Sequence, residues 1–192
     1  MISKEQVSHS KILQTLQILS GSKIFWITAF AILTALSAQV AIPAKPVPFT
    51  LQTLLVLLSG AFLGSRNGAY SQFLYLFMGI VRLPVFAQIA DTPLGFSRII
   101  GPTGGYLLAF PVAAFLVGFL IERRKNYWSI VASMFIGELV IVFLGVLHLT
   151  TFYTKNFEES LKIGAAVFSI WMVVKVFIAA SVYMAIAGIK KK

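Results

Sequence analysis

The sequence predicts an all-α membrane protein with six transmembrane helices. Hydrophobic residues make up 58% of its 192 residues and charged residues only 11%, whereas a soluble domain carries about 25% charged residues. The mean hydropathy is +0.89, and the apolar residues fall into runs of the kind that cross a bilayer. A chain of this length has room for one membrane domain and no separate soluble domain.

Six apolar runs define the predicted helices, at residues 24–42, 50–63, 69–81, 104–121, 128–149 and 163–189. The turn "GSRNG", residues 64–68, joins the second and third runs as a helical hairpin. The first run is too long for a signal-peptide core and has no clear cleavage site, so we expect it to be retained. The predicted organisation is therefore an N-terminal segment 1–23, a membrane domain 24–189 and a basic tail 190–192.

Positive charges predict the orientation, because cytoplasmic loops carry an excess of Lys and Arg. With six spans both termini lie on one side, and ten of the sixteen Lys and Arg residues fall there. Five fall on the other side, and Lys175 lies inside the last run. We expect cytoplasmic termini in a multi-pass protein of the plasma membrane. Residues 1–23 form either an amphipathic helix on the inner leaflet or a partly ordered tail.

The residue inventory argues against several classes of function. The chain has no cysteine and two histidines, His9 and His148, in distant and different settings. It contains no HExxH, GxSxG or Gly-rich GK[ST] motif. We therefore expect no enzyme, no metal site and no cofactor. The net charge of +10 comes from residues that flank membrane helices, which argues against a nucleic-acid partner.

The stretch "AIPAKPVPFTLQTL", residues 41–54, is unusual because three prolines interrupt an apolar region. The helix that follows has 14 residues and spans about 21 Å, less than the roughly 30 Å hydrocarbon core. The proline segment must then dip into the outer half of the protein, where non-helical backbone survives only if it is buried or lines a cavity. Proline suits that place because it has no N–H to leave unpaired. We expect a rigid lid or cavity wall.

Lys175 and Glu138 are charged residues inside the sixth and fifth apolar runs. A charge at such depth is costly and usually has a partner or a function. In one interpretation the two residues pair and only fix packing. In the other, which we prefer, they line a polar pocket for a solute, because Trp171 stands four residues before Lys175 on the same helix face.

Two small-residue motifs have weaker signals. "GPTGG", with Thr103, opens the fourth helix, where exposed backbone N–H groups favour an anion; a tightly packed helix start explains it equally well. Ala31 and Ala35 share one face of the first helix, and such pairs let membrane helices approach closely. They serve either internal packing or docking of another membrane protein.

Four motifs stand in the order found in one family: "IPAKPVPFTLQTL", "GAFLG", "YLFMGIVRLPVFA" and "GPTGGYLLAF". In these motifs the chain resembles the BioY family, the biotin-binding S components of energy-coupling factor (ECF) transporters. The resemblance implies six helices, biotin held near the outer surface under the first outer loop, and a chain that topples to carry its ligand inward. It also implies that Ala31 and Ala35 dock on an ECF transmembrane subunit, which two ATPase subunits complete.

The resemblance extends to the ligand site. Gln52, Tyr106 and Lys175 match the family's positions, and Phe49 is expected near the ligand. The family commonly carries Asp-x-x-Lys in the sixth helix, but this chain has Met172 where the Asp would stand. An acceptor for the ureido N–H groups of biotin is then needed, and we expect Glu138 or Asp91 to supply it.

The carboxylate of biotin is expected to bind Arg98 or the helix start at Thr103. Because Met172 departs from the family pattern, an S component for another vitamin or small acid is the first alternative. A structural or assembly membrane protein that binds no solute is the second.

Overall fold

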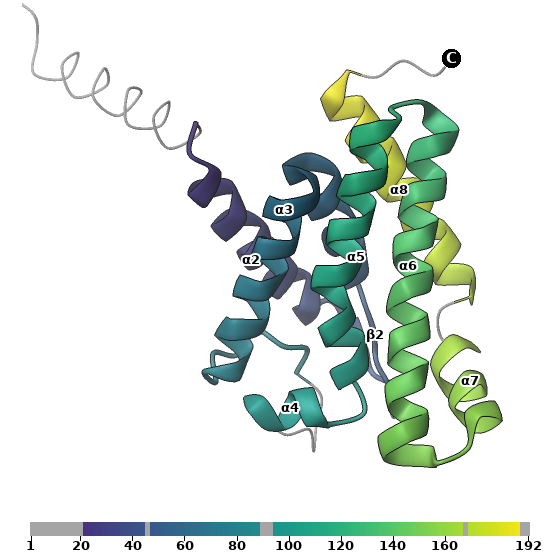
Figure 1. Ribbon diagram of the computed structural model, residues 1–192. Helices are drawn as coiled ribbons and strands as arrows, with labels where there is room; N and C mark the ends of the chain where they lie inside the picture. Colours follow the sequence, from purple (N-terminus) through teal and green to yellow (C-terminus); the bar gives the residue numbers. More distant parts are fainter. Residues whose placement is uncertain (1–20, 45–46, 89–93, 167–168, 189–192) are drawn as a thin grey trace, which may run out of the picture.

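The computed structural model describes residues 21–44, 47–88, 94–166 and 169–188 and shows a helical bundle. Five helices, α2, α3, α5, α6 and α8, run along the bundle, while α4, α7 and a two-stranded hairpin gather at one end (Figure 1). The elements are α2 (Lys23–Gln39), β1 (Ala41–Ile42), β2 (Phe49–Thr50), α3 (Gln52–Ile80), α4 (Phe96–Ile100), α5 (Gly104–Arg123), α6 (Tyr127–Leu149), the π-helix η1 (Thr150–Thr154), α7 (Phe157–Ala166) and α8 (Ser169–Ala187).

Helix α3 is a hairpin of two helical arms, as the "GSRNG" turn predicts. The chain reverses at Gly64, whose φ of 79° and ψ of 178° are not helical and suit glycine alone. The arms lie against each other, since the side chain of Gln72 donates to Ser59 at 3.1 Å. The turn is held by α5, because Oε1 of Glu122 accepts the backbone N–H of Ser65 at 2.8 Å.

The first predicted helix, residues 24–42, is shorter in the structure. Helix α2 ends at Gln39, and the chain then enters β1, which pairs antiparallel with β2 (Ala41 with Thr50, Ile42 with Phe49). Val47 and Pro48 between the strands are buried, whereas Pro43 is exposed, so the second half of the proline segment packs inside the protein. We call the described residues of 41–50 the lid.

Helices α5 and α6 agree with the predicted runs to within two residues at each end. The prediction of a single helix over residues 163–189 is wrong. The structure has the end of α7 and the whole of α8 there instead. Helix α7 starts at a local cap, since Oδ1 of Asn156 accepts the N–H of Glu158 at 3.0 Å. The hydrophobic pattern conceals this break because the last residues of α7 are themselves apolar. Most of the predicted segment 1–23 and all of the tail 190–192 lie outside the described residues.

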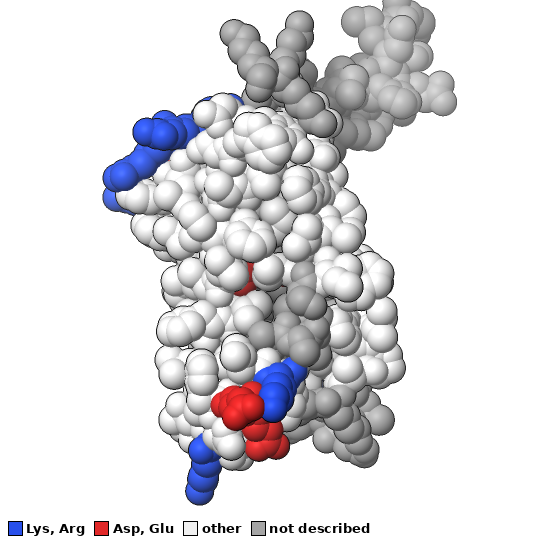
Figure 2. Space-filling model, turned by 90° about the vertical axis from the view of Figure 1, so that its right-hand side faces the viewer, with Lys and Arg blue, Asp and Glu red and all other residues white. Residues whose placement is uncertain are grey.

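Charged side chains gather at the two ends of the molecule, and the face between them is almost without charge (Figure 2). One end carries Arg123 and Arg124, where α5 stops, and the other carries α7 with Glu158 and Lys162. Within the described chain, Gly104–Arg123, Tyr127–Thr154 and Ile170–Ala187 are long and apolar enough to cross a membrane, and Lys23–Gln39 is a shorter apolar helix. The count of six spans and the side of the termini stay predictions.

Candidate functional site

Three side chains from three helices meet in a buried polar cluster. Nζ of Lys175 on α8 lies 3.0 Å from Oε1 of Glu138 on α6. Thr53 on α3 bridges them, because its hydroxyl accepts from Lys175 and donates to the same Oε1 at 2.8 Å. Thr53, Glu138 and Lys175 are all almost completely buried. The two charges predicted inside apolar runs therefore do pair, and Thr53 is a member that the sequence did not indicate.

The two carboxylate oxygens of Glu138 differ in their hydrogen bonding. Its Oε1 receives both the ammonium of Lys175 and the hydroxyl of Thr53. Its Oε2 is fully buried and has no hydrogen-bond partner within the described part of the chain. Leaving such an acceptor unpaired costs about 1–3 kcal/mol. A donor group from outside the chain would reach this oxygen only after a local rearrangement, because Glu138 lines neither of the two cavities described below.

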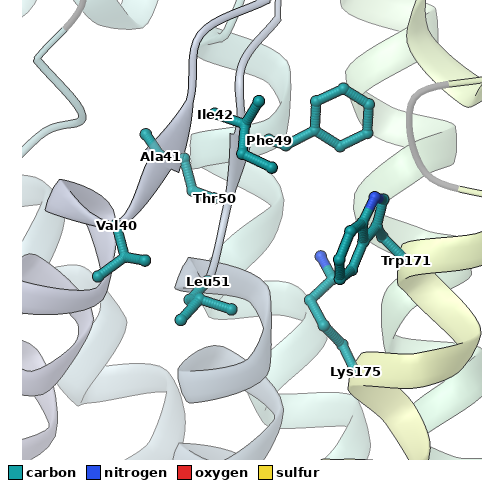
Figure 3. Close-up of a pocket in the computed structure, with 8 residues that line it drawn as sticks. All are labelled: Val40, Ala41, Ile42, Phe49, Thr50, Leu51, Trp171 and Lys175. Carbon is teal, nitrogen blue, oxygen red and sulfur yellow. The ribbon is translucent and has the colours of Figure 1, made fainter.

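An apolar cavity of about 270 Å³ lies beside Lys175. Figure 3 shows Trp171 and Lys175 extending from α8 toward the lid, where Phe49 lies across the cavity. Its lining residues are Val40, Ala41, Ile42, Phe49, Thr50, Leu51, Trp171 and Lys175. We call it the aromatic cavity. An apolar wall with one charged donor is a common design for binding small organic solutes.

A second, smaller cavity of about 40 Å³ also borders strand β2. It is lined by Val47, Pro48, Thr50, Gln52, Thr53, Thr103, Tyr106, Leu107, Phe110 and Ile141. Thr50 borders both cavities, and Thr53 connects this one to the buried charges. Among the described residues, Oγ1 of Thr103 is buried without a hydrogen-bond partner. We call this space the small cavity, and the lid forms one of its walls.

Gln52 belongs to a chain of hydrogen bonds that leads away from the small cavity. Its Oε1 accepts from the hydroxyl of Thr50 at 2.9 Å, and its Nε2 donates to the hydroxyl of Tyr75 at 2.5 Å. The Tyr75 hydroxyl in turn donates to the carbonyl of Val85 at 3.3 Å. Tyr75 was not predicted, because a tyrosine in an apolar helix carries no signal of its own.

Two of the predicted anion-binding features serve packing here. Arg98 is buried and donates to the carbonyl of Ala87 at 2.9 Å, and it lines neither cavity. The "GPTGG" glycines allow close approach of α5 to its neighbours: a Cβ on Gly104 would lie 1.6 Å from the carbonyl oxygen of Ile99, and one on Gly105 2.2 Å from Cβ of His148. His148 also binds the carbonyl of Gly101 at 3.1 Å, which accounts for it structurally.

The remaining predicted residues line neither cavity in the described part of the chain. Asp91 lies outside the described residues. Ala31 is completely buried in the core of the chain and Ala35 is partly buried against it. The alanine face of α2 is therefore turned toward α3 in this conformation, and its docking on a partner stays a prediction. The described part of the chain contains no group of three or more His, Cys, Asp or Glu residues that could hold a metal ion.

An apolar helical bundle with a buried charged cluster beside a lidded apolar cavity matches the class of integral membrane proteins that bind a small solute. The crystal structure described as "the S-component for biotin from an ECF-type ABC transporter" has the same fold, with a TM-score of 0.74 over 100% of this chain and 97% of that one, at 22% identity. Residues 9–192 match the profile described as the BioY family. The chain belongs to the BioY family.

Named relatives agree with this assignment. The "Biotin transporter BioY" of Thermotoga maritima is 36% identical over 79% of this chain and 87% of that protein. The "Probable biotin transporter BioY" of Lysinibacillus sphaericus is 42% identical over 64% of this chain and 62% of that protein. The protein is thus an integral protein of the plasma membrane and a member of a transporter family.

Proposed function

We propose that the chain is the membrane subunit that captures biotin outside the cell and delivers it inward with an ECF energising module. The observation that carries this proposal is the buried Lys175–Glu138 pair, with an acceptor oxygen that the described chain leaves without a partner. Membership of the BioY family and the names of its relatives support the choice of ligand. The activity is transport, without a chemical step on the solute.

The cluster offers one acceptor and one donor that suit the ureido ring of biotin. Its ureido ring has two N–H donors and one carbonyl acceptor. Oε2 of Glu138 supplies an acceptor, which is needed because Met172 stands where the family resemblance implies an aspartate. Lys175 supplies the donor to the carbonyl. Phe49 and Trp171 supply apolar walls beside it, and Gln52, Thr103 and Tyr106 supply polar groups on the far side of the lid.

The lid must move for this ligand to enter. Pockets for small organic molecules typically measure about 300–1,000 Å³, whereas the small cavity measures about 40 Å³ and the aromatic cavity about 270 Å³. The two cavities meet at Thr50 of strand β2, which borders both. Displacing the lid would merge them into one site of ligand size. The prolines favour a lid that moves as a stiff unit.

The partners we propose are an ECF transmembrane subunit and two ATPase subunits. The chain has no phosphate-binding GK[ST] loop, so ATP hydrolysis must come from elsewhere. The structural neighbour is described as part of an ECF-type transporter. Ala31 and Ala35 remain the proposed docking residues on α2, and their burial implies that docking would require α2 to shift against α3.

The test is a calorimetric titration of the purified protein with biotin, with dethiobiotin as a near analogue. We expect binding tighter than about micromolar, which corresponds to about −8 kcal/mol. Glu138→Gln keeps the shape of the side chain but removes its charge, and it should weaken biotin binding by about tenfold or more. Asp91→Asn is the companion variant, because Asp91 is the other predicted acceptor. Unchanged biotin affinity in both variants would refute the proposed acceptor.

Met172 favours a second candidate function, that of an S component of the same fold for another vitamin or small acid. Its side chain packs with the apolar core and offers no acceptor on α8. A ligand with fewer N–H donors than biotin would suit such a site. The same titration with a panel of vitamins separates the two candidates: a vitamin that binds at least tenfold more tightly than biotin would favour the second.

A further inference from the structure

We propose that Tyr75 is a positioning residue, which holds the amide of Gln52 toward the ligand and ties the lid to the outer loop 84–87. The inference rests on the proposed function in taking Gln52 as a ligand-binding residue. Tyr75 itself lines neither cavity. It acts through Gln52, with which it shares a buried hydrogen bond.

The hydrogen bonds form a directed series from the lid to the outer loop. The hydroxyl of Thr50, on strand β2, donates to Oε1 of Gln52, and Nε2 of Gln52 donates to the hydroxyl of Tyr75. The Tyr75 hydroxyl then donates to the carbonyl of Val85. Each of these three side chains donates one hydrogen bond to the next group in the series. Hydrogen bonds arranged in this way strengthen one another.

This series fixes which way the amide of Gln52 faces. Flipping the amide would turn its oxygen toward the hydroxyl of Tyr75, which would have to give up its bond to Val85 in order to donate to that oxygen. The hydroxyl of Thr50 could still accept from the flipped NH₂, so the bond to Val85 is what favours the observed orientation. In the observed orientation, Nε2 keeps a second hydrogen and Oε1 a second lone pair. Since Gln52 lines the small cavity, one donor and one acceptor of its amide remain for a ligand there.

The loop 84–87 at the far end of the series is held by several side chains. Nε2 of Gln39 contacts the carbonyls of Pro84 at 3.4 Å and Phe86 at 3.3 Å, and Arg98 binds the carbonyl of Ala87 at 2.9 Å. With Tyr75 on Val85, four consecutive carbonyls are held. The loop is therefore held in place, and the hydrogen bonds of Tyr75 and Gln52 connect Thr50 in the lid to it.

The packing of Tyr75 makes its hydroxyl separable from its ring. The side chain is completely buried. Its ring meets Phe86 edge-on at 5.5 Å and stacks with Phe110 at 6.3 Å, centroid to centroid. Tyr75→Phe would keep both ring contacts and remove only the hydroxyl. Tyr183→Phe is the matched control, because Tyr183 is also buried and packs edge-on against Phe62 away from both cavities.

Biotin titration is the first test. We expect Tyr75→Phe to weaken binding about tenfold and Tyr183→Phe to leave it within about twofold. If Tyr75 acts through Gln52, the double variant Tyr75→Phe/Gln52→Ala should bind no more weakly than Gln52→Ala alone. Additive losses in the double variant, or unchanged affinity in Tyr75→Phe, would overturn the inference.

Hydrogen exchange of the ligand-free protein is the second test. We expect Tyr75→Phe to speed amide exchange several-fold both in the lid and in residues 84–87, and Tyr183→Phe to change neither. Faster exchange in residues 84–87 with an unchanged lid would overturn the coupling. If the unaltered chain does not bind biotin, the proposed function fails, and the exchange measurement still decides the role of Tyr75.

Discussion

Glu138 and Lys175 carry opposite charges in a part of the bundle that excludes water. Moving each charge out of water costs several kcal/mol, and only close pairing with good hydrogen bonds offsets that cost. Thr53 supplies one of these bonds by bridging the two groups. The remaining oxygen of Glu138 is not compensated within the described chain. Such incomplete pairing is what a binding site requires and what a purely structural ion pair avoids.

Removing one partner should therefore be severe. Lys175→Met and Glu138→Gln should each lower the free energy of unfolding by about 3–5 kcal/mol, because each leaves a buried charge unpaired. The double variant should lose less than the two single losses combined. Denaturant unfolding in detergent measures all three, with Lys162→Met as control.

The control disrupts the exposed Lys162–Glu158 pair, whose atoms lie 2.7 Å apart, and should cost under about 1 kcal/mol. If the single losses at Lys175 and Glu138 add fully in the double variant, the two charges are not coupled.

For single residues, the sequence identifies the charged members of the site more readily than the hydroxyl-bearing ones. Lys175 and Glu138 were predictable because a charge in an apolar run is visible in the letters alone. Thr53 and Tyr75 were not, because Thr and Tyr are ordinary residues of membrane helices. Their importance arises only from pairing: Thr53 lies 85 residues from Glu138 and 122 from Lys175 in the chain. Arg98 shows the converse, since its charge suggested a ligand but its partner is a backbone carbonyl.

The hairpin of α3 is the element that places the site. Its first arm carries Gln52 and Thr53, and its second arm carries Tyr75. The reversal at Gly64 sets how the two arms meet, because residues 52 and 75 must face each other for their hydrogen bond. Gly118 of α5 packs against the same turn, where a Cβ would lie 2.4 Å from the backbone nitrogen of Ser65. The placement of Gln52, Thr53 and Tyr75 thus depends on the turn that joins the two arms of α3.

Gly64→Ala should destabilise the protein by about 1–3 kcal/mol, because an L side chain is strained at this φ and ψ. The added Cβ would also lie 2.5 Å from Oε1 of Glu122, which holds the turn. Thermal unfolding in detergent measures the loss. Gly101→Ala is the control, since its nearest neighbours lie at an ordinary 3.4 Å and its φ is −69°. Equal stability of the two variants would contradict this account.

Elements were predictable where polarity changes abruptly. Helix α5 starts at a glycine-rich stretch, the basic residues 123–125 mark the junction of α5 and α6, and the α3 turn has a Gly-Ser-Arg-Asn-Gly sequence. The short helix α4 and the two-residue strands are too brief to leave a periodic pattern. The separation of α7 from α8 was missed because both sides of the break are apolar, and hydrophobicity does not record a change in chain direction.

For the whole molecule, the segregation of charge predicts how it sits in the membrane. The end with Arg123 and Arg124 also holds Lys125, whereas the opposite end mixes acidic and basic residues on α7. The positive-inside rule places the basic end in the cytoplasm. The lid and both cavities then lie toward the outside, where a ligand arrives.

Single-cysteine labelling tests this orientation directly, because the unaltered chain has no cysteine and serves as the blank. In intact cells, a membrane-impermeant thiol reagent should label Lys162→Cys and spare Lys125→Cys; both positions are exposed. Opened cells should label both. The reverse pattern in intact cells would invert the orientation and place the lid on the cytoplasmic face.

The neutrality of the Lys175–Glu138 pair has an electrical consequence. A single charge carried across a membrane does about 2.3 kcal/mol of work per 100 mV of membrane potential. Opposite charges held 3.0 Å apart travel together, so their contributions cancel if the whole site is carried from one face to the other. The membrane potential then acts on the ligand's own carboxylate, and the Lys175–Glu138 pair neither drives nor opposes the passage.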